Sequence, residues 1–448
     1  MENIIKADST VLDILGKAKS SNAGYRLMKY CIAHNVPEGV LLFHVLTREM
    51  LMLTPEEYDQ ILELDYLKEK WFVIPENLNE KEYADLVRWV CRSLDKKNSY
   101  ITNYTILTTT ECNARCFYCY EKGCKKVTMS AETADKVAVF MKEQCGQNLV
   151  NISWFGGEPL VNFQVIDQIT EKLQSEGISF SCSMISNGYL FDDEMVERAV
   201  DQWKLKKVQI TLDGTEEVYN RSKAYVYDEE SAYQVVLGNI ERLLNAGIRV
   251  TIRLNMNLKN AENLMKLADE LAVCFSNKKK PTVYAHLIYE DQVKWDEYYT
   301  DEELKKLYDM MEMLEEKLSE YELFAELKQG LRKSLKIRNC MADNGRSLVV
   351  LPDGHLGLCE HYTETNLIGH IDSEDRDQNL IAEWKELDDE ITECADCFYF
   401  PECIRLRKCP GLEKCSEFER QQIQCKVKRA MMNEFKYWNI KGLKKDDV

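Results

Sequence analysis

The chain has 448 residues, of which 45% are hydrophobic and 30% are charged, and it carries a formal net charge of −18. The length predicts two or three domains, and the composition excludes intrinsic disorder over most of the chain. Because an acidic surface repels phosphate groups, binding to nucleic acid or to an anionic membrane is not expected. No apolar run is long enough to cross a bilayer and residues 1–21 lack the apolar core of a signal peptide, so a cytoplasmic protein is expected.

Residues 1–100 are predicted to form a small α+β module. The apolar run 39–53 predicts two strands joined by a turn, and Thr54 is expected to cap a helix that follows at once. A short strand at 71–74 and a helix capped by Asn79 complete this module.

Residues 101–290 alternate predicted strands with predicted helices. Six strands in series, each followed by a helix, predict a parallel sheet that is either flat or curved into a partial barrel. The strands are expected at 104–107, 151–155, 179–185, 207–212, 249–254 and 282–287. Helical patterns lie between them, for example at 130–144 and 233–245.

The remainder of the chain changes character. Residues 301–336 are strongly charged and have a helical pattern, so the segment 291–336 is expected to be a helical bridge. From 337 to 448 the regular patterning fades, and cysteines, glycines and prolines take over. Such a segment buries little apolar surface, and metal binding is expected to support its folding.

Three of the seventeen cysteines, Cys112, Cys116 and Cys119, follow the first predicted strand. In a large chain without an export signal, cysteines indicate metal-binding thiolates rather than disulfides. Three thiolates on one tight loop can hold three irons of a [4Fe–4S] cluster and leave the fourth iron open to a small chelating molecule. A zinc site would need a fourth protein ligand in the same loop. Tyr118 could lie against an adenine ring.

Polar groups follow the next four predicted strands. Ligands of barrel proteins bind at the carboxyl ends of the strands, so these groups are expected to share a site. Two glycines could let backbone groups approach a ligand closely, and the glutamate after them could accept from an ammonium group. Each short motif is by itself more often a simple turn. The groups are Gly156-Gly157-Glu158-Pro159, Ser186-Asn187-Gly188, Thr211 with Asp213, and Arg253.

The loop from Cys112 to Cys119 resembles the signature of the radical SAM superfamily, with Tyr118 in its aromatic position. The segment from Gly156 to Pro159 resembles the GGEP motif of that superfamily, which meets the methionine amino group of S-adenosyl-L-methionine. The resemblance covers roughly residues 101–290 and implies a partial (β/α)6 TIM-like barrel. It further implies that Thr211 and Arg221 contact the methionine carboxylate and that Ser186 and Asn187 contact the ribose. Asp213 and Arg253, from the strand-end pattern, complete the expected cofactor-binding set.

Eight more cysteines lie in the last quarter of the chain, enough for two clusters with four ligands each. Their spacing resembles the SPASM extension of radical SAM enzymes, which holds two auxiliary [4Fe–4S] clusters, so three clusters are expected in all. The resemblance implies an outer cluster on Cys394, Cys397, Cys403 and Cys425, and an inner cluster on Cys340, Cys359 and Cys409. A pair of zinc knuckles and a purely structural role for the clusters are the alternatives.

The inner cluster departs from the family pattern. Five residues rather than three separate Cys403 from Cys409, and Ser334 stands where some members have an extra cysteine. This cluster therefore either has an open iron or takes Cys415 as its fourth ligand, and Cys415 is favoured. Glu360 follows Cys359, at the position of an aspartate base in anaerobic sulfatase-maturating enzymes, and could take a proton from a substrate radical. The alternative is an ordinary surface glutamate.

Residues 1–100 resemble the winged-helix-like leader-peptide recognition element of ribosomal-peptide maturases. The resemblance implies an oxidoreductase that uses a 5′-deoxyadenosyl radical to install an intramolecular cross-link in a precursor peptide with a leader. A thioether is favoured over a carbon–carbon bond, and the electron donor is expected to be of flavodoxin or ferredoxin type. The alternatives are a structural cap on the barrel for residues 1–100, and for the whole chain either a formylglycine-generating sulfatase maturase or an iron–sulfur electron-transfer or scaffold protein.

Overall fold

The computed structural model describes residues 1–17, 24–94, 100–119, 121–227, 231–288, 299–324, 331–335, 337, 340–361, 365–385, 392–403, 415 and 417–446. The chain forms two compact units. The first unit comprises residues 1–97, 326–340 and 386–448, and the second comprises 98–325 and 341–385. No described helix is long and apolar enough to span a membrane.

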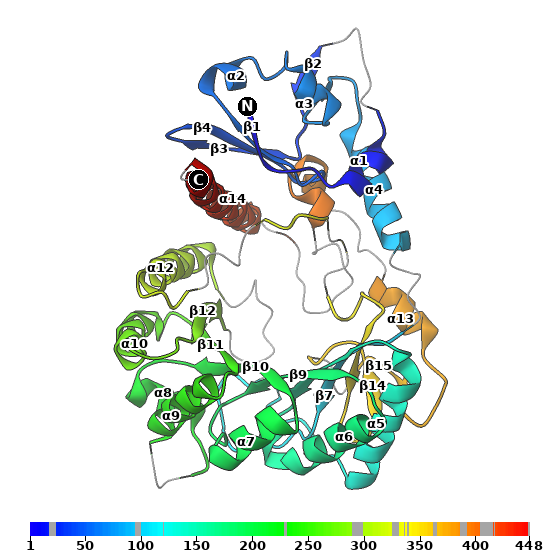
Figure 1. Cartoon of the computed structure of the whole chain (residues 1–448), viewed down its shortest axis with the longest axis vertical. Coiled ribbons are helices and arrows are strands. Elements are labelled where there is room, and N and C mark those ends of the chain that lie inside the picture. Colours follow the sequence, from blue (N-terminus) through cyan, green and yellow to red (C-terminus); the bar gives the residue numbers. More distant parts are fainter. Residues whose placement is uncertain are drawn as a thin grey trace. The chain divides into compact units, whose positions relative to one another are not determined.

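The second unit is built on a nine-stranded sheet (Figure 1). Its six parallel strands lie side by side in chain order: β7 (Asn103–Leu107), β8 (Val150–Phe155), β9 (Phe180–Ser186), β10 (Leu205–Leu212), β11 (Arg249–Met256) and β12 (Thr282–Leu287). All six strands predicted from the sequence are thus confirmed, with small shifts at their ends. Next to β7 the sheet continues through β13 (Ser347–Val350), which is parallel to it, and then through antiparallel β14 (His355–Gly357) and β15 (Leu367–His370).

Helices connect the parallel strands. The expected helices near 130–144 and 233–245 are present, and each connection keeps its neighbouring strands adjacent in the sheet. The helices are α5 (Ala131–Cys145), α6 (Phe163–Ser175), α7 (Asp193–Asp201), α8 (Glu216–Lys223), α9 (Ala232–Asn245) and α10 (Ala261–Cys274), with a 3-10 turn η2 (Pro159–Asn162) before α6 and α13 (Gln378–Lys385) after β15. Burial alternates along the strands: in β9, Phe180, Cys182 and Met184 are buried, whereas the residues between them are partly exposed.

The predicted helix over 301–336 is wrong in its length. Helix α12 (Asp301–Glu320) begins with a capping box formed by Thr300 and Glu303, but it ends at Glu320. Glu322 adopts a left-handed conformation with φ of 57°, and the backbone N–H of Leu323 donates to Leu318 O at 2.9 Å. This C-terminal motif stops the helix. The described residues after it, 321–324 and 331–335, are not helical.

The first unit contains a four-stranded antiparallel sheet in the order β1 (Glu2–Ile5), β5 (Met50–Leu53), β4 (Gly39–His44), β3 (Cys31–Val36). The predicted hairpin within 39–53 is confirmed as β4 and β5, and Thr54 caps the next helix as expected. Strands β1 and β3 were not predicted. The other elements are α1 (Ser9–Leu15), α2 (Pro55–Asp59), α3 (Asp65–Glu69), α4 (Glu80–Leu94), and the paired strands β2 (Tyr25–Leu27) and β6 (Val73–Pro75).

The N-terminal module of the first unit, residues 1–94, shares its core with residues far along the chain. Tyr30, Phe43 and Trp71 belong to the same buried cluster as residues from two later segments. Those residues are Leu331, Leu335, Ile337, Phe400, Val427, Met431 and Phe435. The later elements are η4 (Thr392–Asp396), η5 (Phe400–Glu402) and α14 (Glu417–Asp446). The compact units therefore cut across the four segments expected from the sequence.

Candidate functional site

The cysteine loop that follows β7 is fixed by backbone hydrogen bonds on both sides. Before the first cysteine, Glu111 O accepts from the N–H of Glu158 at 2.9 Å. Within the loop, the N–H of Arg115 donates to Lys223 O at 2.8 Å, and Asn113 O accepts from the N–H of Val226 at 2.9 Å. Cys112, Cys116 and Cys119 are all partly buried. The loop is thus held between the segment after β8 and the end of α8.

Gly156 and Gly157 make room for this loop. A Cβ atom on Gly156 would lie 2.1 Å from Thr109 O, and one on Gly157 would lie 2.2 Å from Glu111 O. Both distances are far below a normal contact, and Gly156 also has a φ of 125° that favours glycine. The close approach for which these glycines are needed is to the chain's own backbone just before Cys112, so the motif positions the cysteine loop.

Glu158 is completely buried and contacts two other predicted site residues, Ser186 and Asn187. Its Oε1 accepts from Ser186 Oγ at 2.9 Å and from the N–H of Leu160 at 3.2 Å, and its Oε2 accepts from the N–H of Asn187 at 2.8 Å. Burial raises the pKa of Glu158 from 4.5 to about 7, against the opposing effect of these hydrogen bonds and of Lys223. A nearby positive charge, such as that of an ammonium group, would stabilise the ionised form of this buried carboxylate.

The raised pKa of Glu158 predicts a pH-dependent stability. Because the folded protein holds this proton more tightly than the unfolded chain does, the stabilisation is complete below the unfolded pKa of 4.5 and is lost as the pH rises through about 7. Between low and high pH, the Glu158 proton is expected to lower the free energy of unfolding by about 3 kcal/mol in protein free of S-adenosyl-L-methionine. The Glu158→Gln variant should lack this part of the pH dependence. Urea denaturation at about pH 5 and about pH 8 measures it. The exposed Glu197→Gln is the control, and an unchanged pH dependence in Glu158→Gln would contradict the prediction.

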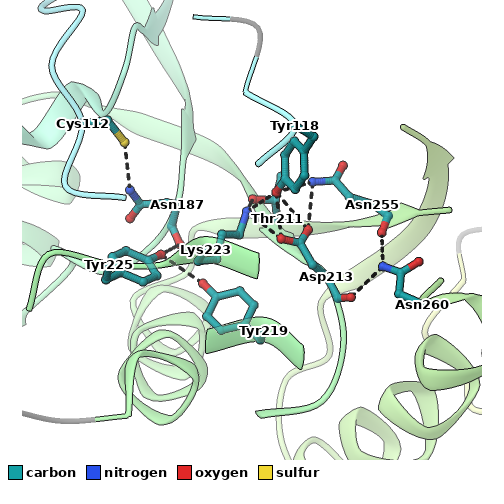
Figure 2. Close-up of polar contacts among 10 residues, drawn as sticks. All are labelled: Cys112, Tyr118, Asn187, Thr211, Asp213, Tyr219, Lys223, Tyr225, Asn255 and Asn260. Carbon is teal, nitrogen blue, oxygen red and sulfur yellow. Dashed lines mark hydrogen bonds and ion pairs between the residues drawn. The ribbon is translucent and has the colours of Figure 1, made fainter. Parts of the chain in front are cut away.

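A buried polar network lies where β10 and β11 end (Figure 2). The hydroxyl of Tyr118 donates to Asp213 Oδ2 at 2.8 Å, and Lys223 Nζ lies 2.6 Å from both the Tyr118 hydroxyl and Thr211 Oγ1. Lys223 Nζ is also 3.4 Å from Asp213 Oδ2, and both side chains are buried. Asn255 Nδ2 donates to Asp213 Oδ1 at 3.0 Å. Three predicted residues, Tyr118, Thr211 and Asp213, therefore meet around one lysine.

Lys223 remains charged in this network. Burial alone would lower its pKa, but Asp213 and then Tyr118 oppose that effect, and the net pKa lies well above the ordinary value. The Tyr118 hydroxyl has a raised pKa, chiefly through burial and then through Asp213. The ion pair thus fixes the aromatic residue of the cysteine loop to strand ends that lie about 100 residues away in sequence.

A second chain of contacts joins the loop after β9 to the first cysteine (Figure 2). Asn187 Nδ2 donates to Asn113 Oδ1 at 2.7 Å and lies 3.9 Å from Cys112 Sγ. The Tyr225 hydroxyl donates to Asn187 O at 3.3 Å. Within the part of the chain that the structure describes, Asn113 Nδ2 and Asn255 Oδ1 are buried without a hydrogen-bond partner. Two residues that contact the site, Asn113 through Asn187 and Asn255 through Tyr118, thus each keep one unpaired polar atom.

Two predicted residues do not join these networks. Arg221 is 71% exposed on α8 and forms an ion pair with Glu217 at 3.6 Å. Arg253 on β11 lies with its Nη2 3.0 Å from His286 Nδ1. The sequence had suggested neither Lys223 nor Asn255. Asn255 could have been found by its place near the end of a predicted strand, because the predicted residues were chosen by the same criterion.

The cysteines of the first loop fit a [4Fe–4S] cluster. The loop offers three thiols and no histidine, and burial raises the pKa of Cys112 to about 12, so a thiolate there needs a compensating cation such as iron. Among the described residues no three His, Cys, Asp or Glu side chains converge on one metal ion. A cubane needs no such convergence, because each of its thiolates binds a different iron.

The later cysteines divide between the units. Cys394, Cys403 and Cys415 lie close enough to Cys397 to raise its pKa, although burial is the larger cause. Cys425, expected in the same cluster, is exposed on α14. Cys340 belongs to the first unit and Cys359 to the second, while Cys409 lies outside the described residues. Glu360 keeps one buried carboxylate oxygen, Oε2, without a partner among the residues that the structure describes.

Comparison with known proteins finds a shared domain. Residues 106–271 match the model of the Radical SAM superfamily. GTP 3′,8-cyclase from Clostridium perfringens is 30% identical over 160 residues, which cover 35% of this chain and 47% of the cyclase. The match therefore spans about half the length of that relative.

Two solved structures share the fold over a larger part of the chain. Native anSMEcpe with bound AdoMet and Cp18Cys peptide gives a TM-score of 0.56 at 16% identity and covers 76% of this chain and 99% of that one. Streptococcus suis SuiB bound to the precursor peptide SuiA gives a TM-score of 0.50 at 12% identity and covers 85% and 94%. At such identities the likeness concerns the fold alone.

Proposed function

We propose that this chain, an enzyme that carries a radical SAM domain, installs an intramolecular cross-link in a ribosomally made precursor peptide. The observation that carries the proposal is the convergence of Tyr118, Glu158, Ser186, Asn187, Thr211 and Asp213 around the cysteine loop. When bound, a [4Fe–4S] cluster with S-adenosyl-L-methionine supplies a 5′-deoxyadenosyl radical that removes a hydrogen atom from the substrate.

The chain's own residues have distinct roles in this proposal. Cys112, Cys116 and Cys119 hold the first cluster, and the Lys223–Asp213 pair holds their loop in place through Tyr118. Glu158, which is buried and has a raised pKa, accepts a hydrogen bond from the ammonium group of the cofactor. The unpartnered Asn113 Nδ2 offers a further donor. Arg253 stays a candidate cofactor contact from the sequence alone.

The substrate is proposed to be a peptide. Two proteins of similar fold were solved with peptides bound, and the sheet of the N-terminal module ends in β3, an edge strand to which an extended leader could add. A thioether is the favoured product: an S–H and a C–H bond break and one S–C bond forms. Deoxyadenosine would carry away the hydrogen atom, Glu360 would take the thiol proton, and the later cysteines would hold an auxiliary cluster able to accept the remaining electron.

The proposal is tested by accurate mass. The enzyme is co-expressed without oxygen with the short peptides encoded beside its gene, and each peptide is then weighed and fragmented. Loss of two hydrogen atoms, together with a block in fragmentation between two residues, is expected for one peptide. The same co-expression with the Cys112→Ala variant is the control. Unmodified peptides alongside active cleavage of S-adenosyl-L-methionine would instead favour the second candidate, a formylglycine-generating enzyme that acts on a folded sulfatase.

A further inference from the structure

The segment 392–403 of the first unit, which carries Cys394, Cys397 and Cys403, has little regular structure of its own. It consists of two short 3-10 turns, η4 and η5, joined by a turn. The three cysteines pack against the core that the N-terminal module shares with α14. Its internal backbone hydrogen bonds are short-range turn bonds, such as Phe400 N–H to Cys397 O at 3.2 Å. Its longer-range polar contacts include side chains of the N-terminal module.

Arg88, from α4 of the N-terminal module, holds the backbone of η5. Its Nη1 donates to Phe400 O and, at 3.3 Å, to Pro401 O, and its guanidinium lies 4.9 Å from the centre of the Phe400 ring. Arg88 is 3% exposed. One buried cation of the module thus satisfies two carbonyl groups of the segment between Cys397 and Cys403.

Arg48, from the turn between β4 and β5, holds the last residue before Cys403. Its Nη1 forms an ion pair with Glu402 Oε2 at 2.8 Å, and both side chains are buried. Its Nε donates to Arg332 O at 2.9 Å. Lys29 of the same module donates to Ala395 O, between the first two cysteines of the segment. Because a buried charge is costly without its partner, a conformation of the segment that separated Glu402 from Arg48 would be disfavoured.

We propose that Arg48 and Arg88 are positioning residues for the outer auxiliary cluster: they hold segment 392–403 in the conformation that presents Cys394, Cys397 and Cys403 to iron. The N-terminal module is then part of the assembly of this cluster as well as a recognition element. The inference rests on the proposed function, which assigns these cysteines to a cluster.

The test compares Arg48→Met and Arg88→Met with Cys397→Ala, which removes a ligand directly. Arg26→Met is the matched control, because Arg26 also pairs with a buried glutamate, Glu80 at 2.9 Å, but its described hydrogen bonds stay within residues 27–80. After anaerobic reconstitution, both arginine variants are expected to lose about four iron atoms per chain and the electron paramagnetic resonance signal of one cluster. The Arg26→Met protein should keep both.

Two further measurements separate positioning from general unfolding. Both arginine variants should keep the signal of the first cluster and its response to S-adenosyl-L-methionine, since Cys112, Cys116 and Cys119 lie in the other unit. The double variant Arg48→Met with Glu402→Met removes the unpaired charge without restoring the contact, so it is expected to stay short of iron. Recovery of iron in this double variant would show that an unpaired buried charge, and not lost positioning, caused the loss, and would overturn the inference. If Arg48→Met and Arg88→Met keep full iron and an unchanged signal, the positioning inference is overturned and the proposed function is unaffected. Wild-type protein with iron for one cluster only would overturn the proposed auxiliary clusters.

Discussion

Changing Cys112, Cys116 and Cys119 together to alanine is expected to abolish formation of 5′-deoxyadenosine while leaving the auxiliary iron in place. All three thiols lie on the loop after β7, and the later cysteines lie on other segments. In the proposed function these thiolates hold the cluster whose open iron chelates the cofactor, so the triple variant would lack that site. The measurements are chromatography of anaerobic reactions supplied with dithionite, and the iron content of the purified variant.

A serine variant at Cys124 is the control for this experiment. Cys124 follows the loop closely but lies outside the predicted spacing, so Cys124→Ser should cleave S-adenosyl-L-methionine normally. Persistent formation of 5′-deoxyadenosine by the triple variant would exclude the loop as the site of cleavage. Loss of all iron would mean that the auxiliary cysteines bind no cluster by themselves.

Lys223→Met is expected to be the most damaging single change outside the cysteines. The substitution keeps most of the side-chain volume but leaves Asp213 buried without its cation, which costs about 3–5 kcal/mol of folding free energy. It also removes one contact of the Tyr118 hydroxyl, which then keeps only Asp213 and Asn255, so the anchor of the cysteine loop is weakened. A displacement of about 1 Å in the reacting groups lowers a rate about 100-fold, and a fall of that size in 5′-deoxyadenosine formation is expected.

Stability and activity must be measured together for this variant. Urea denaturation gives the loss of folding free energy, and the rate of 5′-deoxyadenosine formation is taken where the variant is still folded. Lys142→Met is the matched control, because Lys142 forms its ion pair with Glu176 at a half-exposed position on α5. A Lys223→Met protein that keeps both its stability and its cleavage rate would show that the network does not position the loop.

The parallel strands of the second unit were predictable because short apolar runs alternate with amphipathic helices. The cysteine loop was predictable because its spacing is rare. Lys223 was not, because a lysine in the last turn of a helix usually lies in solvent. Its burial depends on Tyr118 and Asp213, and no local pattern records that contact. The role of Gly156 was missed for the same reason, since the group that excludes a side chain is the carbonyl of Thr109.

The first unit was harder to predict. The local signals of its hairpin and of the Thr54 cap were clear, but its core takes Phe400, Met431 and Phe435 from segments more than 300 residues away. Those residues lie among cysteines and charged residues, where single apolar positions carry little information. The end of helix α12 was also mispredicted. The charged helical pattern of the sequence continues past Glu322, where the left-handed backbone conformation ends the helix.

The shared core of the first unit has a consequence for how the chain is made. On the ribosome, residues 1–97 emerge before the later segments of the first unit, so the apolar surface around Tyr30, Phe43 and Trp71 stays uncovered until Phe400 and α14 have been synthesised. The strands β7 to β12 are complete long before that point. A nascent chain with exposed apolar surface is prone to aggregate and is a substrate for chaperones. Translation pauses after residue 325 would therefore lengthen the most vulnerable interval of its biogenesis, and a chain released before α14 would carry an N-terminal module with an open core.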